Sequence, residues 1–220
     1  MIRLRPAKQN LLTLLRAGIL TSLANMRRLG ACLLACCLTF GLAPRVLAQE
    51  SEESFISREY QLKALFLYQF GGGNYVEWPD AAFSNDEAPF VIGLLGHTPV
   101  EKTLQDVSIK YKIKGRKIVV QQFDPMSTTQ TCQILFIGRD VGPAIQKQVV
   151  EKMQNQPVLI VGETVGFAGR GGSMNFVIES NKIHIEINLD AAKHQQLKIS
   201  AKLLGLSNAK IVESSETTQH

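Results

Sequence analysis

One short stretch of the chain, IHIEIN, places an imidazole and a carboxylate two residues apart. Its alternation predicts a strand whose isoleucines face the core, so that His184, Glu186 and Asn188 share the outer face. This spacing suits two metal ligands, or a general base with its orienting partner. No third ligand follows at a matching interval, and His97 and His194 lie on other predicted elements. We therefore predict no metal site on this strand, and either a solvated polar face or a contact surface for a partner or ligand.

A second candidate is the glycine-rich stretch in VLIVGETVGFAGRGGSMNF, residues 158–176. A phosphate-binding loop needs its glycines to be followed by Lys and Ser or Thr at the start of a helix, where backbone N–H groups face the anion. Here SMNFVIE follows, which is typical of a strand. The stretch is predicted to connect two strands, not to bind a nucleotide.

Aromatic and basic side chains offer a further binding surface. Phe167 and Arg170 lie at the predicted tip of the glycine-rich loop, where they would insert into a partner or cover a pocket. Trp78, the only tryptophan, lies between Glu77 and Pro79 and either closes the core or, if exposed, anchors a partner. The candidate partner- or ligand-binding residues are therefore Trp78, Phe167, Arg170, His184, Glu186 and Asn188.

Motifs for catalysis are absent from the sequence. It contains no Gly-x-Ser-x-Gly, no His-Glu-x-x-His and no Gly-x-Gly-x-x-Gly opening a helix. Cys132 lies in the apolar run CQILFI, which predicts a buried thiol rather than a nucleophile. The basic run at 110–117 is predicted to be a charged loop rather than an anion site. We expect a protein that is not an enzyme and has no cofactor.

The charge is divided unevenly along the chain. Residues 1–48 hold seven basic residues and no acidic one, although the whole chain has 24 basic and 19 acidic residues. The remaining 17 basic residues are outnumbered by the acidic ones, so residues 49–220 carry a net charge of about −2. This balance predicts no nucleic-acid binding.

The basic N-terminal stretch has the pattern of an export signal. Two arginines, Arg27 and Arg28, precede an apolar run at 29–42. Small residues then occupy the positions expected before a cleavage site, which would follow Ala48. We predict a signal peptide over 1–48, with Met26 as an alternative start, and a mature domain over 49–220 in the periplasm. A membrane anchor and a lipoprotein at Cys36 are the rival interpretations, and both need a longer apolar run than this one.

The rest of the chain alternates predicted helices with predicted strands, which indicates parallel pairing in an open α/β sheet. We expect a single Rossmann-like domain with a mixed sheet of about six strands, flanked by helices, and an antiparallel hairpin near the C-terminal end. The predicted helices are 55–70, 100–107, 143–153 and 190–205, and the predicted strands are 90–95, 118–123, 132–137, 158–161, 175–179 and 183–189.

Several segments, in this order, resemble the YfiR-like family of periplasmic proteins. They are LKALFLYQF, YVEWP and CQILFI, the pairs GF at 166–167 and GG at 171–172, and IEINL and LKISAKLL. The resemblance covers nearly all of the predicted mature chain. Disulfide-bonded members are similar to this chain at Cys132 and carry a second cysteine where it has Gly93.

The resemblance implies a non-enzymatic regulator that binds the periplasmic domain of an inner-membrane diguanylate cyclase and represses it, which would control cyclic di-GMP signalling and biofilm formation. It also implies an outer-membrane lipoprotein that sequesters the regulator, and a homodimer. The alternative from the residues themselves is a periplasmic small-ligand sensor or carrier, with a pocket at the strand end near Gly96 and His97.

Overall fold

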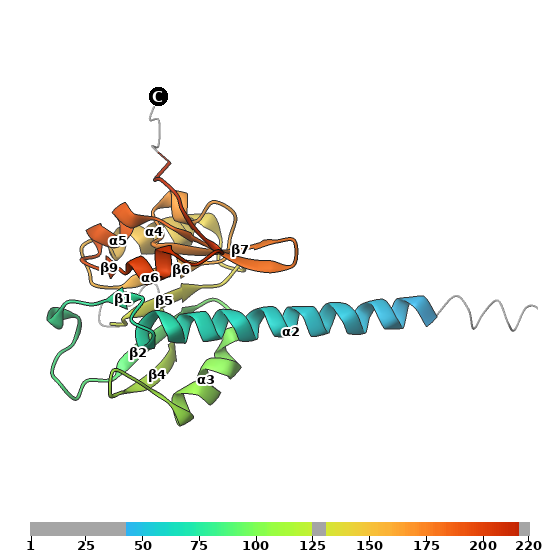
Figure 1. The fold of residues 1–220 in the computed structure, drawn as a ribbon, viewed down its shortest axis with the longest axis horizontal. Coiled ribbons are helices and arrows are strands. Elements are labelled where there is room, and N and C mark those ends of the chain that lie inside the picture. The colour runs from blue at the N-terminus through green and yellow to red at the C-terminus, as the bar shows by residue number, and fades with distance from the viewer. Residues whose placement is uncertain (1–42, 125–130, 216–220) are drawn as a thin grey trace, which may run out of the picture. The chain divides into compact units, whose positions relative to one another are not determined.

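A computed structural model describes residues 43–124 and 131–215 of the chain. The chain divides into two compact units, Met1–Phe55 and Ile56–His220. Of the first unit, only the beginning of helix α2 (Ala43–Gly72) is described. The second unit contains the sheet and the remaining elements (Figure 1). Most of the predicted signal peptide, 1–42, lies outside the described residues.

The second unit is built on a mixed sheet with the strand order β10-β8-β7-β6-β5-β2-β4-β3. The eight strands are β2 (Phe90–Leu95), β3 (Lys112–Ile113), β4 (Arg116–Gln122), β5 (Ile134–Ile137), β6 (Leu159–Gly162), β7 (Met174–Glu179), β8 (Lys182–Ile187) and β10 (Ala209–Ile211). The helices are α3 (Val100–Lys110), α4 (Pro143–Lys152), α5 (Leu189–His194) and α6 (Ala201–Leu204), with short 3-10 turns η1 (Asp80–Ala82) and η2 (Ala168–Arg170). A separate two-stranded pair joins β1 (Val76–Glu77) to β9 (Lys198–Ile199).

The centre of the sheet is parallel. Strand β2 pairs with both β4 and β5, β5 pairs with β6, and β6 pairs with β7, all in the parallel sense. The unit β2–α3–β4 proceeds to one side of β2, whereas β5–α4–β6 proceeds to the other. The carboxyl ends of β2 and β5 therefore form the topological switch point, where open α/β sheets bind ligands.

Apolar side chains fill both faces of the sheet. Along β5, Phe136 belongs to one core cluster, whereas Leu135 and Ile137 belong to the other, as alternation along a strand requires. Helix α2 packs on the first face through Tyr60, Ala64, Leu67 and Phe70, which recur every three or four residues. The opposite face is covered by α4, through Val149 and Val150.

The predicted fold class is confirmed, including the antiparallel β7–β8 hairpin near the C-terminal end. The sheet has eight strands rather than about six, because the short strands β3 and β10 give no apolar run long enough to recognise in the sequence. Among the described residues, no helix combines the length and the apolar character needed to cross a membrane.

The predicted long helix 190–205 is wrong, because the chain stops and starts again within it. Helix α5 is capped by Asn188, whose side chain accepts a hydrogen bond from the N–H of Ala191. It ends before Gln196, whose φ of 57° is left-handed. Ser200 then caps α6, accepting from the N–H of Leu203. The two capping residues and the left-handed residue therefore divide the segment into two short helices, although its apolar spacing predicts one continuous helix.

Candidate functional site

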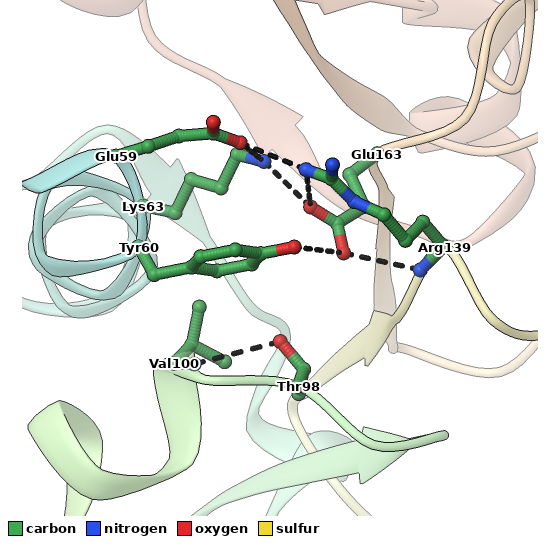
Figure 2. Close-up of polar contacts among 7 residues, drawn as sticks. All are labelled: Glu59, Tyr60, Lys63, Thr98, Val100, Arg139 and Glu163. Carbon is green, nitrogen blue, oxygen red and sulfur yellow. Dashed lines mark hydrogen bonds and ion pairs between the residues drawn. The ribbon is translucent and has the colours of Figure 1, made fainter. Parts of the chain in front are cut away.

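A cluster of charged side chains lies at the carboxyl edge of the sheet. Glu163 directly follows β6, and Arg139 follows β5 after one glycine. Because β5 and β6 are parallel neighbours, their carboxyl ends meet at one edge. Helix α2 adds Glu59, Tyr60 and Lys63 from its inner face (Figure 2). We call these five residues the ionic cluster.

Lys63 is the centre of the ionic cluster. Its side chain is 1% exposed, and its ammonium bonds Glu59 Oε1, one helical turn earlier, and Glu163 Oε2 at 2.5 Å. The ammonium also lies 4.7 Å from the centroid of the Tyr60 ring. A buried lysine destabilises a fold by several kcal/mol unless its charge is paired and hydrogen-bonded. Here two carboxylates, themselves almost fully buried, supply that pairing.

Arg139 closes the cluster on the solvent side. One guanidinium nitrogen donates to Glu59 Oε1 at 2.9 Å and to Glu163 Oε2 at 3.3 Å, and the backbone N–H of Arg139 donates to Glu163 Oε1 at 3.1 Å. Burial by itself lowers the pKa of Arg139, but the attraction of Glu163 and Glu59 more than offsets this effect and raises it. Two positive and two negative groups thus neutralise one another.

Tyr60 completes the cluster as a neutral donor. Its hydroxyl donates to Glu163 Oε1 at 3.4 Å. Burial, followed by the nearby negative charge of Glu163, raises the pKa of Tyr60 to about 12. The hydroxyl therefore stays protonated at neutral pH and cannot act as a base there.

The charged groups of the ionic cluster are paired with one another and hold segments of the chain together. Each carboxylate is held by a lysine and an arginine, so neither is available as a nucleophile or a general base. Nor do His, Cys, Asp and Glu side chains gather in threes suited to a metal ion anywhere in the described ranges 43–124 and 131–215. What the cluster does is join α2 to the segments that follow β5 and β6.

The switch point beside the cluster is covered by Asp140. Its carboxylate Oδ2 accepts from the backbone N–H of His97 at 2.9 Å. A Cβ atom on Gly96 would lie 2.3 Å from the other carboxylate oxygen, so that oxygen fills the space above the glycine. The imidazole of His97 projects into solvent, with its Nδ1 3.5 Å from the same carboxylate. The strand end predicted to bind a ligand thus holds a side chain of the protein itself.

Trp78 lies as a lid on the core. Its indole packs edge-on against Phe90, with ring centroids 5.1 Å apart, and its Nε1–H donates to the carbonyl oxygen of Gln133 at 3.0 Å. The side chain is half-buried. Of the two interpretations of Trp78, the structure agrees with the lid.

Phe167 does not project from the glycine-rich loop, contrary to the prediction. It is 1% exposed, because its ring lies against Gly162 and Gly172. A Cβ atom at these two positions would approach the ring to 2.3 and 2.1 Å. The glycines therefore make room for an aromatic ring and not for a phosphate. The exposed apolar side chain of the loop is Val165, at 92%.

Arg170 braces the same loop from outside. Its guanidinium donates to the carbonyl oxygen of Val165 at 2.7 Å, to Thr164 Oγ1 at 3.3 Å and to Gln146 Oε1 at 3.5 Å. The residue remains exposed to solvent. Arg170 is thus placed at the surface as predicted, three residues from a buried Phe167.

His184, Glu186 and Asn188 do not share one surface. The first two are half-buried on the same face of β8, and Glu186 accepts from Asn175 Nδ2 at 3.0 Å. Asn188 is fully buried, because the strand ends at Ile187 and the asparagine caps α5. Its Nδ2 also donates to the carbonyl oxygen of Ala168 at 2.8 Å. Asn188 therefore holds the fold together instead of extending the predicted contact face.

Cys132 is a buried thiol, as predicted, at 3% exposure. Burial raises its pKa to about 12. A Cβ atom on Gly93 would lie 3.3 Å from the sulfur of Cys132, so Gly93 faces the thiol. With glycine there, the thiol has no partner for a disulfide at that position.

The raised pKa of Cys132 predicts an alkaline loss of stability. The unfolded thiol ionises near its ordinary pKa of 9, whereas the folded thiol keeps its proton to about 12. The contribution of this thiol to the free energy of unfolding should therefore be fully present below pH 9. It should then fall by about 1.4 kcal/mol for each pH unit between 9 and 12. Urea unfolding at a series of pH values should show a shallower fall for Cys132→Ala. Equal slopes for the two proteins would contradict the assignment.

The residues of the ionic cluster were missed by the sequence analysis. Lys63 and Glu59 lie four residues apart in the predicted helix 55–70, on the side of that helix that buries Tyr60 and Ala64. Glu163 and Arg139 follow strands that are buried throughout. Charges placed on a core face and directly after buried strands are the signal that would have indicated them.

The fold and the cluster together define a class: an α/β domain with an internally paired ionic edge and, within its described residues, no group of side chains suited to hold a metal ion. A comparison with protein-family profiles then gives the family. The chain belongs to the YfiR/HmsC-like family, whose profile matches residues 60–208, more than half of its length. A search of curated proteins finds no match.

Proposed function

We propose that this protein is a non-enzymatic periplasmic regulator that binds the periplasmic domain of an inner-membrane diguanylate cyclase and represses it. The observation that carries the proposal is membership of the YfiR/HmsC-like family over residues 60–208. Cyclic di-GMP would then be the output of the regulated enzyme in the cytoplasm, and biofilm formation its consequence. The regulator itself would bind no nucleotide.

Export through a cleavable signal supports the periplasmic location. The basic residues at 27–28, the apolar run at 29–42 and the small residues ending at Ala48 have the order of a signal peptide. The mature chain would begin at Gln49 and carry a slightly negative net charge. We further propose that it acts as a homodimer and that an outer-membrane lipoprotein sequesters it when repression is released.

Repression of this kind is conformational. A regulator that binds the inactive arrangement of a membrane enzyme more tightly than the active one shifts the equilibrium between them. A preference of about 3 kcal/mol shifts that equilibrium roughly 150-fold. A rigid domain suits this role, because it can favour one arrangement of its partner only if it does not deform to fit both. The ionic cluster and the core lid of Trp78 contribute to such rigidity.

The proposal is tested by deleting the gene and measuring cellular cyclic di-GMP. Loss of the repressor should raise the concentration, and biofilm formation should increase with it. A concentration unchanged by the deletion would contradict repression of a cyclase. In that case, thermal stabilisation of the purified protein in a metabolite screen would support the small-ligand sensor instead.

A further inference from the structure

The segment Glu163–Arg170 presents one aliphatic side chain to solvent at the carboxyl edge of the sheet. Val165 is 92% exposed, more than any other large apolar residue of the described chain. An isolated exposed valine on a flexible loop would need no explanation. This one is held in place by the contacts of Glu163 before it and of Phe167 and Arg170 after it.

Three anchors fix the segment that carries Val165. Glu163, at its start, is locked by Lys63 and Arg139 in the ionic cluster. Phe167, two residues beyond Val165, is buried between two glycines. Arg170, at its end, donates back to the carbonyl oxygen of Val165 at 2.7 Å. A rigid side chain loses little entropy on binding, so its burial is not offset by the ordering of a loop.

The charge beside Val165 is positive. All three acceptors of the Arg170 guanidinium are neutral: a carbonyl, a hydroxyl and a side-chain amide. Its charge is therefore not compensated by these contacts, in contrast to that of Arg139, which two carboxylates balance. A surface that complements this one combines an apolar pocket for the valine with a carboxylate for the guanidinium.

We propose that the segment Glu163–Arg170 is the surface through which this protein binds its partner, with Val165 inserted into an apolar pocket that carries an acidic side chain at its rim. The inference rests on the proposed function, since the partner would be the periplasmic domain of the cyclase. Phe167 contributes by supporting the segment, and Val165 and Arg170 contribute the contacts.

The first test compares Val165→Asp with Ile109→Asp, each in the full chain expressed from its own gene. Ile109 is an aliphatic residue on α3 that is 82% exposed, so it controls for the loss of an exposed aliphatic group. Replacing a central contact residue with a charged one should weaken binding about 30-fold or more. Val165→Asp should therefore raise cyclic di-GMP to the level of the deletion strain, with normal protein amount and thermal stability. Repression by Val165→Asp equal to that of Ile109→Asp would overturn the proposal.

The second test identifies the partner directly. Photoreactive benzoylphenylalanine is placed at position 165 or at position 109 of the full chain, and the cells are irradiated. Position 165 should give a discrete adduct with a membrane diguanylate cyclase, mapped to an apolar peptide that contains Asp or Glu. An adduct at 165 with a protein that has no cyclase domain would leave the surface standing and contradict the proposed function. A cyclase adduct at 109 only, or no adduct at 165, would overturn the surface.

Discussion

Replacing Lys63 with methionine is expected to lower the free energy of unfolding by about 3–5 kcal/mol, because it leaves buried carboxylates without their shared cation. Glu59 and Glu163 are 6% and 1% exposed, and both bond the Lys63 ammonium. Arg139 would remain, but it is 55% exposed and is a single charge facing two. The effect should be measured by urea unfolding at neutral pH.

The matched control for this substitution is Lys147→Met. Lys147 also pairs with a glutamate one helical turn away, Glu151, but at 3.8 Å and with both side chains more than half exposed. Loss of such a surface pair changes stability by less than about 1 kcal/mol. In a double-mutant cycle, Glu163→Gln should cost less in the Lys63→Met background than alone, because the two groups interact. If Lys63→Met lowers the free energy of unfolding no more than Lys147→Met does, the stabilising role of the ionic cluster is contradicted.

Phe167→Ala should lower the free energy of unfolding by about 3–5 kcal/mol, the usual range for removing a fully buried phenylalanine. The ring fills the space that Gly162 and Gly172 leave open, so its loss opens a cavity that the backbone cannot readily close. Thermal or urea unfolding checks this result. Val165→Ala, two residues away on the exposed side, should stay within about 0.5 kcal/mol of the wild type.

The Phe167 result separates two accounts of the glycine-rich loop. If Phe167 were a partner contact at a loop tip, its replacement would weaken repression and leave stability unchanged. The structure makes it a core residue, so loss of repression by Phe167→Ala would be secondary to loss of stability. A Phe167→Ala protein as stable as the wild type would contradict the buried position of the ring.

The sheet could be predicted because its central strands are unbroken apolar runs. Residues 90–95 and 134–137 are buried almost throughout, and such runs indicate parallel strands covered on both faces. The hairpin could be predicted because Ser180 and Asn181 separate two strands. The division of 190–205 could not, because apolar spacing says nothing about a left-handed Gln196 or a capping Ser200.

The site was less predictable than the fold, because its contacts join residues far apart in the sequence. Lys63 and Glu163 are 100 residues apart, and no periodic pattern links them. The burial of Phe167 depends on Gly172 and on Gly162, which ends β6 one residue beyond the predicted strand 158–161. Asn188 continued the alternation of β8 in the sequence, but the chain turns into α5 at that residue.

The most direct measurement of the central claim is cellular cyclic di-GMP in a deletion strain that expresses either the full chain or a version beginning at Gln49. The second version retains the whole domain matched by the family but lacks the predicted signal, so it should remain in the cytoplasm. Repression from the periplasm predicts that only the full chain restores a low concentration. Equal restoration by both versions, or by neither, would contradict it.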